Sequence, residues 1–205
     1  MLEISTIVKK TAAMFDLFNE HFYGNELTRP AITVSPDGGR EAYGWCSVDK
    51  IWKTGEDMHR EINLCAEYLD RPMPEVCGTL LHEMAHLHDL QNGIADVSNN
   101  GYYHNKRFKE TAEAHGLHIE QHEKYGWTIT TLTEETLAWV EAALGGDAIH
   151  AARLPEGKAG GKTGKGKSKN RSIKYVCPEC GAIIRATREV NVICADCGVP
   201  FERAE

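Results

Sequence analysis

The chain carries the pentapeptide His82–His86 (HEMAH) within an apolar run that begins at Cys77. On an α-helix, residues four apart lie on the same face, separated by one turn, or about 6 Å. Two imidazoles at this spacing can bind one metal ion, with Glu83 beside them. The pattern H-E-x-x-H on a helix is typical of zinc hydrolases. The pentapeptide therefore predicts a helix that provides one side of a zinc site.

The chemistry of such a site assigns a role to each polar residue of the motif. Zinc lowers the pKa of water to about 7, and a neighbouring carboxylate can accept the proton. We therefore expect His82 and His86 to bind a catalytic zinc ion and Glu83 to act as the general base. A catalytic zinc takes three protein ligands, so one more must come from elsewhere. The extended pattern with glycine and histidine farther along the helix is excluded, because Asp89 and Asn92 occupy those positions.

The third ligand is not fixed by the motif itself. His104 is the preferred candidate, because it follows the motif helix after a loop long enough to turn back towards it. Glutamate is the third ligand in some zinc proteases, so Glu110 and Glu113 remain alternatives. His115 is a further alternative. The sequence alone leaves these candidates open.

Periodicity and turn signals predict an α+β fold for residues 1–150, with a small sheet packed on helices. Glycine and proline residues mark most of the boundaries between elements. Residues 94–103 are polar and expected to be irregular, and a turn or strand is expected near Gly126. Helices are predicted over 3–23, 75–91, 104–115 and 133–144, and strands over 31–35, 42–48 and 60–65.

Four cysteines near the C-terminus predict a second, smaller domain over residues 173–205. Cys177, Cys180, Cys194 and Cys197 form two C-x-x-C-G pairs, a spacing that can present four thiolates to one structural zinc ion. The intervening segments 182–187 and 189–193 are expected to form a short hairpin. A unit this small cannot build a sufficient core, so the metal would supply folding energy. Redox-active cysteine pairs are the alternative.

The remaining features concern compartment and membrane. The chain has seven cysteines, an odd number that argues against a complete disulfide framework. Cys46, Cys65 and Cys77 lie in apolar surroundings and are expected to be buried thiols, which suits a reducing compartment. No apolar run is long enough to span a membrane, and the N-terminus lacks the features of a signal peptide. We therefore expect a cytoplasmic protein without membrane contact.

The charge of the chain is unevenly distributed. The net charge is −7, yet residues 155–205 hold ten basic against six acidic side chains. Residues 151–172 are rich in glycine and lysine and are expected to form a flexible linker. A basic tail on an acidic body predicts that any contact with nucleic acid runs through the tail, although a purely solubilising tail is the alternative. The candidate contacts are Lys162, Lys165, Lys167, Lys169, Arg171, Arg185 and Arg188.

Several segments, in this order, resemble one protein family. Residues 1–150 resemble the SprT-like metalloprotease domain that bacterial SprT proteins share with the eukaryotic Spartan proteases, and the four-cysteine tail resembles the zinc ribbon of many SprT proteins. Asn105 departs from the pattern, because the family usually has glycine after the third histidine. The matching segments are LFN at 17–19, FYG at 22–24, AYG at 42–44, EINL at 61–64, TLLHEMAH at 79–86 and HNKRF at 104–108.

The resemblance implies a zincin-like fold and zinc-dependent endoproteolysis. It implies that His82, His86 and His104 bind the catalytic zinc, that Glu83 is the base, and that the ribbon holds a second, structural zinc. It also implies a protein substrate associated with DNA, because the eukaryotic relatives remove proteins crosslinked to DNA. The strand predicted at 42–48 would either hold the substrate as an added β-strand or be a plain core strand.

A second hypothesis comes from a different functional class. The chain would then be a zinc-binding protein associated with nucleic acid, whose protease-like body is regulatory or weakly active. Glu83 is the discriminating residue, because a degenerate enzyme would tolerate its loss. Its presence favours the enzyme. The sequence does not indicate an oligomeric state or a cleavage preference.

Overall fold

The computed structural model describes residues 3–145, 149, 151–154 and 173–204. The chain divides into two compact units, Met1–Ala159 and Gly160–Glu205. Of the linker predicted at 151–172, all residues beyond 154 lie outside this description. No helix in the described ranges is long and apolar enough to cross a membrane.

The first unit is α+β, as predicted, and three of its helices lie where the sequence placed them. The second helix, which carries the pentapeptide, ends at Gly93, whose φ of 68° suits glycine and whose N–H bonds the carbonyl of Asp89. The fourth begins after Thr133, whose side chain accepts a hydrogen bond from the N–H of Thr136. These helices are α1 (Ile4–Tyr23), α2 (Met73–Asn92) and α4 (Glu134–Leu144).

The prediction of a helix starting at His104 is wrong. The third helix, α3, spans Lys106–Ala114, and His104 lies on the short strand β7 (Tyr103–His104). Asn105 separates the two, because its side chain accepts a hydrogen bond from the N–H of Arg107 and so caps the helix. The segment 94–103, expected to be irregular, also contains β6 (Val97–Ser98). Strands of two residues leave no periodic pattern for sequence reasoning to detect.

The sheet on one side of α2 contains all three strands that the sequence predicted. Its order is β1-β5-β2, with β1 (Ala31–Ser35) parallel to β5 (Glu61–Cys65) and β2 (Gly44–Cys46) antiparallel to it. β2 is shorter than the predicted span of 42–48 and lies at the edge of the sheet. Between β2 and β5, an unpredicted hairpin is formed by β3 (Trp52–Thr54) and β4 (Asp57–His59).

A second sheet, of order β6-β7-β9-β8, positions His104. β8 (Leu117–His122) pairs antiparallel with β9 (Gly126–Leu132), and β7 pairs parallel with β9 through His104 and Gly126. Gly126 has a φ of 76°, and a β-carbon there would lie 2.2 Å from the carbonyl oxygen of His104. Only glycine allows the two strands to approach this closely.

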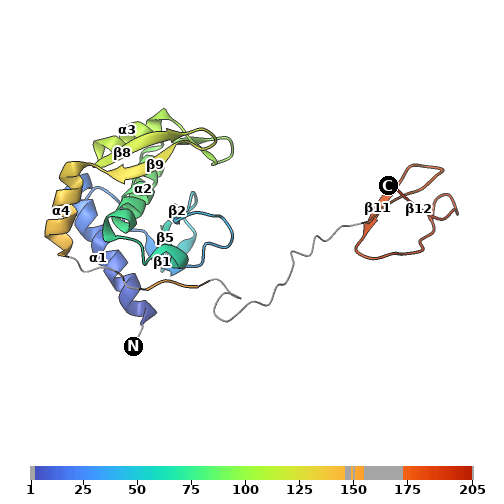
Figure 1. The fold of residues 1–205 in the computed structure, drawn as a ribbon, viewed down its shortest axis with the longest axis horizontal. Coiled ribbons are helices and arrows are strands. Elements are labelled where there is room, and N and C mark those ends of the chain that lie inside the picture. Colours follow the sequence, from blue (N-terminus) through green and yellow to red (C-terminus); the bar gives the residue numbers. More distant parts are fainter. Residues whose placement is uncertain (1–2, 146–148, 150, 155–172, 205) are drawn as a thin grey trace. The chain divides into compact units, whose positions relative to one another are not determined.

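The core anchors α2 at the centre of the first unit. Figure 1 shows α2 between the β1-β5-β2 sheet and the layer formed by α3, β8 and β9. The helices α1 and α4 also contact α2. Burial of apolar side chains from all of these elements holds α2, the helix that carries the pentapeptide, in place. The largest fully buried side chains are Phe15, Phe18, Ile62, Leu64, Val76, Leu80, Leu81, Met84, Phe108, Leu117, Ile119 and Val140.

The second unit is a three-stranded antiparallel sheet of order β11-β10-β12. Its strands are β10 (Ile173–Val176), β11 (Ile183–Ala186) and β12 (Glu202–Arg203). The predicted pairing of segments 182–187 and 189–193 is wrong. β11 pairs with β10 instead, because the first cysteine pair itself forms the turn between them. Residues 189–193 contribute one isolated bridge, between Ile193 and Pro200.

Candidate metal centre

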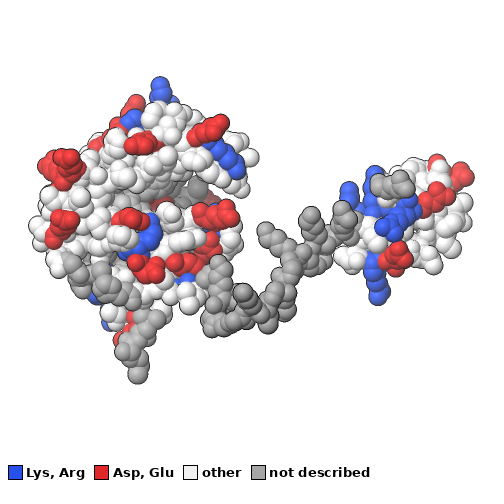
Figure 2. All heavy atoms as spheres, in the orientation of Figure 1, with Lys and Arg blue, Asp and Glu red and all other residues white. Residues whose placement is uncertain are grey.

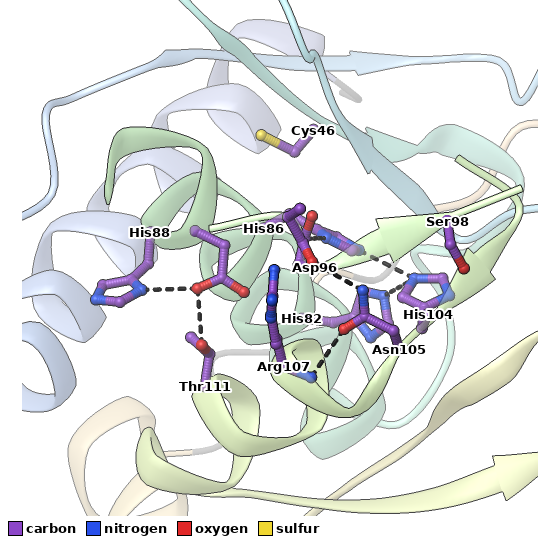
Figure 3. Close-up of polar contacts among 12 residues, drawn as sticks. Cys46, His82, His86, His88, Asp96, Ser98, His104, Asn105, Arg107 and Thr111 are labelled. Atoms are coloured by element: carbon purple, nitrogen blue, oxygen red, sulfur yellow. Dashed lines mark hydrogen bonds and ion pairs between the residues drawn. The ribbon is translucent and has the colours of Figure 1, made fainter. Parts of the chain in front are cut away.

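Three imidazoles converge beside α2. His82 and His86 lie one turn apart on the helix, and His104 reaches them from β7 (Figure 3). The Nε2 atom of His104 lies 3.3 Å from that of His82 and 3.0 Å from that of His86. Nitrogen ligands at tetrahedral positions around zinc are about 3.3 Å apart. The third histidine thus comes from a strand, and both of its distances match those between zinc ligands, with one ligand nitrogen of each histidine within 4.8 Å of the others.

The hydrogen bonds of His82 determine which of its ring nitrogens carries the proton. Its Nδ1 lies 2.8 Å from the hydroxyl of Thr130. That hydroxyl donates its single hydrogen to the carbonyl of Thr128, at 3.2 Å. With its hydrogen placed there, Thr130 accepts a hydrogen bond from Nδ1–H of His82. The Nε2 atom of neutral His82 is left with a lone pair directed at the cluster.

His86 is fixed in the same tautomer by a carboxylate. Its Nδ1 donates to Oδ2 of Asp96 at 2.5 Å, and Asp96 is only 3% exposed. A histidine that binds metal through one nitrogen commonly donates its other N–H to a carboxylate or hydroxyl. Sequence reasoning missed both Asp96 and Thr130. An acidic residue in the loop between two candidate ligands is the one available signal for Asp96, and no signal marks Thr130.

These residues fit a bound zinc ion. With the protons of His82 and His86 on Nδ1, the Nε2 lone pairs of both rings point at Nε2 of His104, at 3.3 and 3.0 Å, and a single N–H of His104 could satisfy only one of them. A cation between the three nitrogens would satisfy all of them. Three imidazole nitrogens match the protein ligand set of many catalytic zinc sites. Among the described residues, two groups have the spacing of a metal site, and His82, His86 and His104 form one of them.

The alternative third ligands lie outside this cluster. Glu110 is exposed, and Glu113 forms an ion pair with Lys109. His115 stacks on Tyr23, with ring centroids 4.0 Å apart, and donates from Nδ1 to the carbonyl of Thr111. None of the three belongs to the histidine group.

Burial keeps two of the histidines neutral. It lowers the pKa of His82 well below the ordinary value, and the neighbouring histidines lower it further. Burial and the charge of His86 lower the pKa of His104 to about 4. Burial also lowers the pKa of His86, but the hydrogen bond to Asp96 and nearby carboxylates outweigh it and leave that pKa raised. Neutral imidazoles are the form that binds metal.

Glu83 lies beside the cluster and is 6% exposed. Burial raises its pKa to about 7, while His86 and a hydrogen bond from the backbone N–H of Cys46 act in the opposite direction. A β-carbon on Gly44 would lie 3.3 Å from Cγ of Glu83, so the glycine lets β2 pack against this side chain. A carboxyl group that titrates near neutral pH can both accept and release a proton there.

The four cysteines of the second unit form the other group with metal-site spacing. The Sγ atoms of Cys180 and Cys194 lie 3.7 Å apart, and thiolates at tetrahedral positions around zinc are separated by about 3.8 Å. The backbone N–H of Cys180 lowers the pKa of Cys177 to about 7, although burial opposes it. The backbone N–H of Ala182 lowers the pKa of Cys180, but the neighbouring thiols outweigh it and leave that pKa raised, as they raise the pKa of Cys197. The fit to zinc therefore rests on the convergence of the four sulfur atoms, which zinc binds as thiolates.

Both cysteine pairs are built in the same way. In the first, the N–H of Cys177 bonds the carbonyl of Ala182, and the N–H of Gly181 bonds the carbonyl of Cys177. The second repeats these bonds from Cys194 to Val199 and from Gly198 back to Cys194. The glycines have φ values of 73° and 70°, which is why each C-x-x-C is followed by glycine.

The residues predicted to contact nucleic acid are only partly described. Arg185 and Arg188 are exposed, and Lys174 lies directly opposite Arg185 in the β10–β11 pair. Figure 2 shows basic side chains gathered on one face of this unit, whereas acidic ones are prominent on the first. Within 173–204, however, four basic side chains are balanced by four acidic ones. The other candidates, Lys162, Lys165, Lys167, Lys169 and Arg171, lie outside the described residues.

Comparison with known proteins gives one match. The sequence model of the SprT-like family matches residues 11–127, more than half of the chain. The matched region contains the pentapeptide, His104 and Asp96, and it ends before Thr130 and the cysteine ribbon. Comparisons with curated proteins and with solved structures found no match.

Proposed function

The chain belongs to the SprT-like family, and from this membership and the histidine cluster we propose that it is a zinc-dependent endopeptidase of zincin-like fold. One observation carries the proposal. Nε2 of His104 lies 3.3 and 3.0 Å from the Nε2 atoms of His82 and His86, whose lone pairs are fixed by Thr130 and Asp96, and a buried glutamate lies beside them. A structural role for these residues would not require two such lone pairs to point at a third ring nitrogen.

The catalytic roles follow from position. His82, His86 and His104 would hold Zn²⁺, which when bound lowers the pKa of water and polarises a peptide carbonyl. Glu83 accepts the proton of the attacking water and passes it to the departing amine. The N–H of Cys46 holds the carboxylate of Glu83 in place between these transfers.

The edge strand β2 provides a place for the substrate. Within the described part of the first unit, β2 pairs with β5 on one side, and no strand pairs with its other edge. An extended peptide can add to such an edge through main-chain hydrogen bonds, with little demand on its sequence. Because Cys46 of β2 bonds Glu83, a peptide on this edge would pass close to the catalytic carboxylate. This placement favours unfolded protein segments as substrates.

We further propose that the ribbon holds a structural zinc ion and directs the enzyme to proteins bound to DNA. The support is the position of Lys174 opposite Arg185, which puts two cations on one face of the sheet, together with the basic segment 155–172. The alternative is a nucleic-acid-associated binding protein with a regulatory or weakly active body. The intact and buried Glu83, with a pKa of about 7, favours the enzyme.

The test is cleavage of an unfolded protein, such as reduced casein, by the zinc-loaded full chain. Replacing a general base typically costs 10²–10⁴-fold in rate, so Glu83→Gln is expected to lower kcat/KM by about that factor while zinc remains bound. Glu110→Gln, an exposed glutamate of α3, serves as the matched control and is expected to retain full activity. Undiminished cleavage by Glu83→Gln would reject the mechanism.

A second arm tests the role assigned to the ribbon. The affinity for single-stranded DNA is measured for the wild type and for the double variant Lys174→Glu, Arg185→Glu. We expect DNA to bind the wild type more tightly than this variant, and the affinity to fall as the salt concentration rises. Equal binding of both proteins would remove this face of the ribbon from the proposal.

A further inference from the structure

Asn105 caps the start of α3 and makes two hydrogen bonds to the loop before β6. Its Oδ1 accepts from the backbone N–H of Arg107 at 2.8 Å, which caps the helix (Figure 3). Its Nδ2 donates to the carbonyl of Ala95 at 2.8 Å. Its backbone N–H donates to the carbonyl of Asp96 at 2.9 Å. The side-chain oxygen of Asn105 therefore caps α3, and its side-chain N–H holds the carbonyl of Ala95. This second bond, from Nδ2 of Asn105 to Ala95, is called the clamp below.

The clamp acts on the residue that orients His86. Asp96 is 3% exposed, and its carboxylate accepts the Nδ1–H of His86. The segment that carries Asp96 follows the C-terminus of α2, where the N–H of Ile94 bonds the carbonyl of Asp89. It is then held by Asn105, which immediately follows His104 in the chain. One asparagine thus contacts the segment that orients His86 and directly follows His104 in the chain.

We propose that Asn105 is a positioning residue of the metal site. By holding Ala95 and Asp96 against the start of α3, it fixes the Asp96 carboxylate relative to His104 and so sets the orientation of His86. The inference rests on the zinc site proposed above, but it concerns a residue that touches neither the metal nor the substrate. Loss of such an outer contact typically costs 10–100-fold in metal affinity.

Substitutions can separate the clamp from the cap. Serine also caps helices, so Asn105→Ser keeps an oxygen for the N–H of Arg107 but has no amide to reach Ala95. Asn105→Asp also keeps the cap, while its second oxygen faces the Ala95 carbonyl instead of donating to it. Thr133→Ala is the matched control, because it removes the cap of α4 and leaves α3 intact.

The experiment measures metal affinity on the metal-stripped full chain by titration with Co²⁺. Thiolate ligands give intense charge-transfer absorption that imidazoles lack, so the cysteine and histidine sites are read separately. We expect Asn105→Ser and Asn105→Asp to weaken the histidine site by about tenfold, and Asp96→Asn by about 10–100-fold, with the cysteine site unchanged. Thr133→Ala is expected to lower the Tm without changing either affinity.

The outcomes separate this inference from the proposed function. If both Asn105 variants bind metal as tightly as wild type and show only a lowered Tm, Asn105 is a helix cap and the inference is wrong. If His86→Ala in the otherwise native chain loses no metal, or the wild-type histidine site takes up none, the proposed function itself fails. Weakened binding in the Asn105 variants, with wild-type behaviour of Thr133→Ala, supports the positioning role.

Discussion

Gly44 of β2 packs directly over Glu83 of α2. A β-carbon on Gly44 would lie 3.3 Å from Cγ of Glu83, 3.2 Å from Cγ2 of Thr79 and 2.8 Å from the carbonyl oxygen of Asn63. This close approach is what brings the N–H of Cys46 within reach of the Glu83 carboxylate. The edge strand β2 and the helix α2 are therefore coupled through Gly44, a position where a side chain would clash.

Gly44→Ala should lower both stability and activity. Overpacking of this kind costs about 1–3 kcal/mol, and displacement of β2 would move Cys46 away from Glu83. Gly78→Ala on α2 is the control, because its β-carbon would lie 3.8 Å from Leu132 and a helical alanine gains about 0.5–1 kcal/mol. Urea unfolding and casein cleavage measure the two effects. Full activity of Gly44→Ala would show that β2 does not position Glu83.

His104→Ala should remove one of two zinc ions from the purified protein. The remaining pair, His82 and His86, supplies two of the three ligands that a catalytic site needs. Glu110→Ala and Glu113→Ala should retain both ions, because these residues lie outside the cluster. Elemental analysis after gel filtration gives the count. Retention of two ions by His104→Ala would mean that Glu110, Glu113 or His115 is the third ligand instead.

Cys177→Ser should remove the other zinc ion. The second unit has few buried side chains in its described part, Tyr175 among them, so loss of the metal should unfold β10 and β11. Hydrogen exchange of the backbone amides at positions 175 and 177 reports the unfolding of β10 directly. The variant His104→Ala provides the comparison. Protection that persists in Cys177→Ser would mean that the ribbon folds without metal.

His115 should make the stability of the first unit depend on pH. Burial, the largest cause, lowers its pKa in the folded protein, whereas the unfolded chain keeps a value near 6.5. Below that value the unfolded state binds more protons, so this contribution is present at pH 7.5 and is lost as the pH falls through 6.5 towards the folded pKa.

The variant His115→Phe isolates this effect. It keeps a ring to stack on Tyr23 but cannot titrate. We expect its free energy of unfolding to fall less than that of wild type between pH 7.5 and 5, measured by urea titration at each pH. The comparison cancels the titration of the other histidines. Parallel pH profiles for the two proteins would exclude His115 as the source.

The parts of the fold and site that sequence reasoning predicted are those encoded locally. The helix of the pentapeptide and the strands at 31–35 and 60–65 have strong apolar patterns. The spacing of the four cysteines is likewise set along a short stretch of chain. The histidines of α2 meet because they are four residues apart on one helix, which no tertiary contact needs to arrange.

The parts that were missed depend on contacts between distant segments. Thr130 meets His82 across 48 positions of the chain, and the packing of β9 against α2 brings it there. The position of His104 on a strand follows from the capping of α3 by Asn105, a residue that sequence reasoning treated only as a departure from a pattern. The ribbon hairpin was misassigned because β10, the true partner of β11, lies before the first cysteine pair.

The attachment of His104 to β7 has a consequence for the metal-free protein. His82 and His86 belong to α2, whereas His104 belongs to a sheet that joins α2 through β9 and α3. An ion held by all three would act as a crosslink between helix and sheet. Chelation would then loosen β6 and β7, the end of the sheet that carries His104, while β8, whose Leu117 and Ile119 are buried in the core, stays folded. The metal-free protein should consequently be cut by added proteases first within residues 94–104, the connection that the crosslink would restrain.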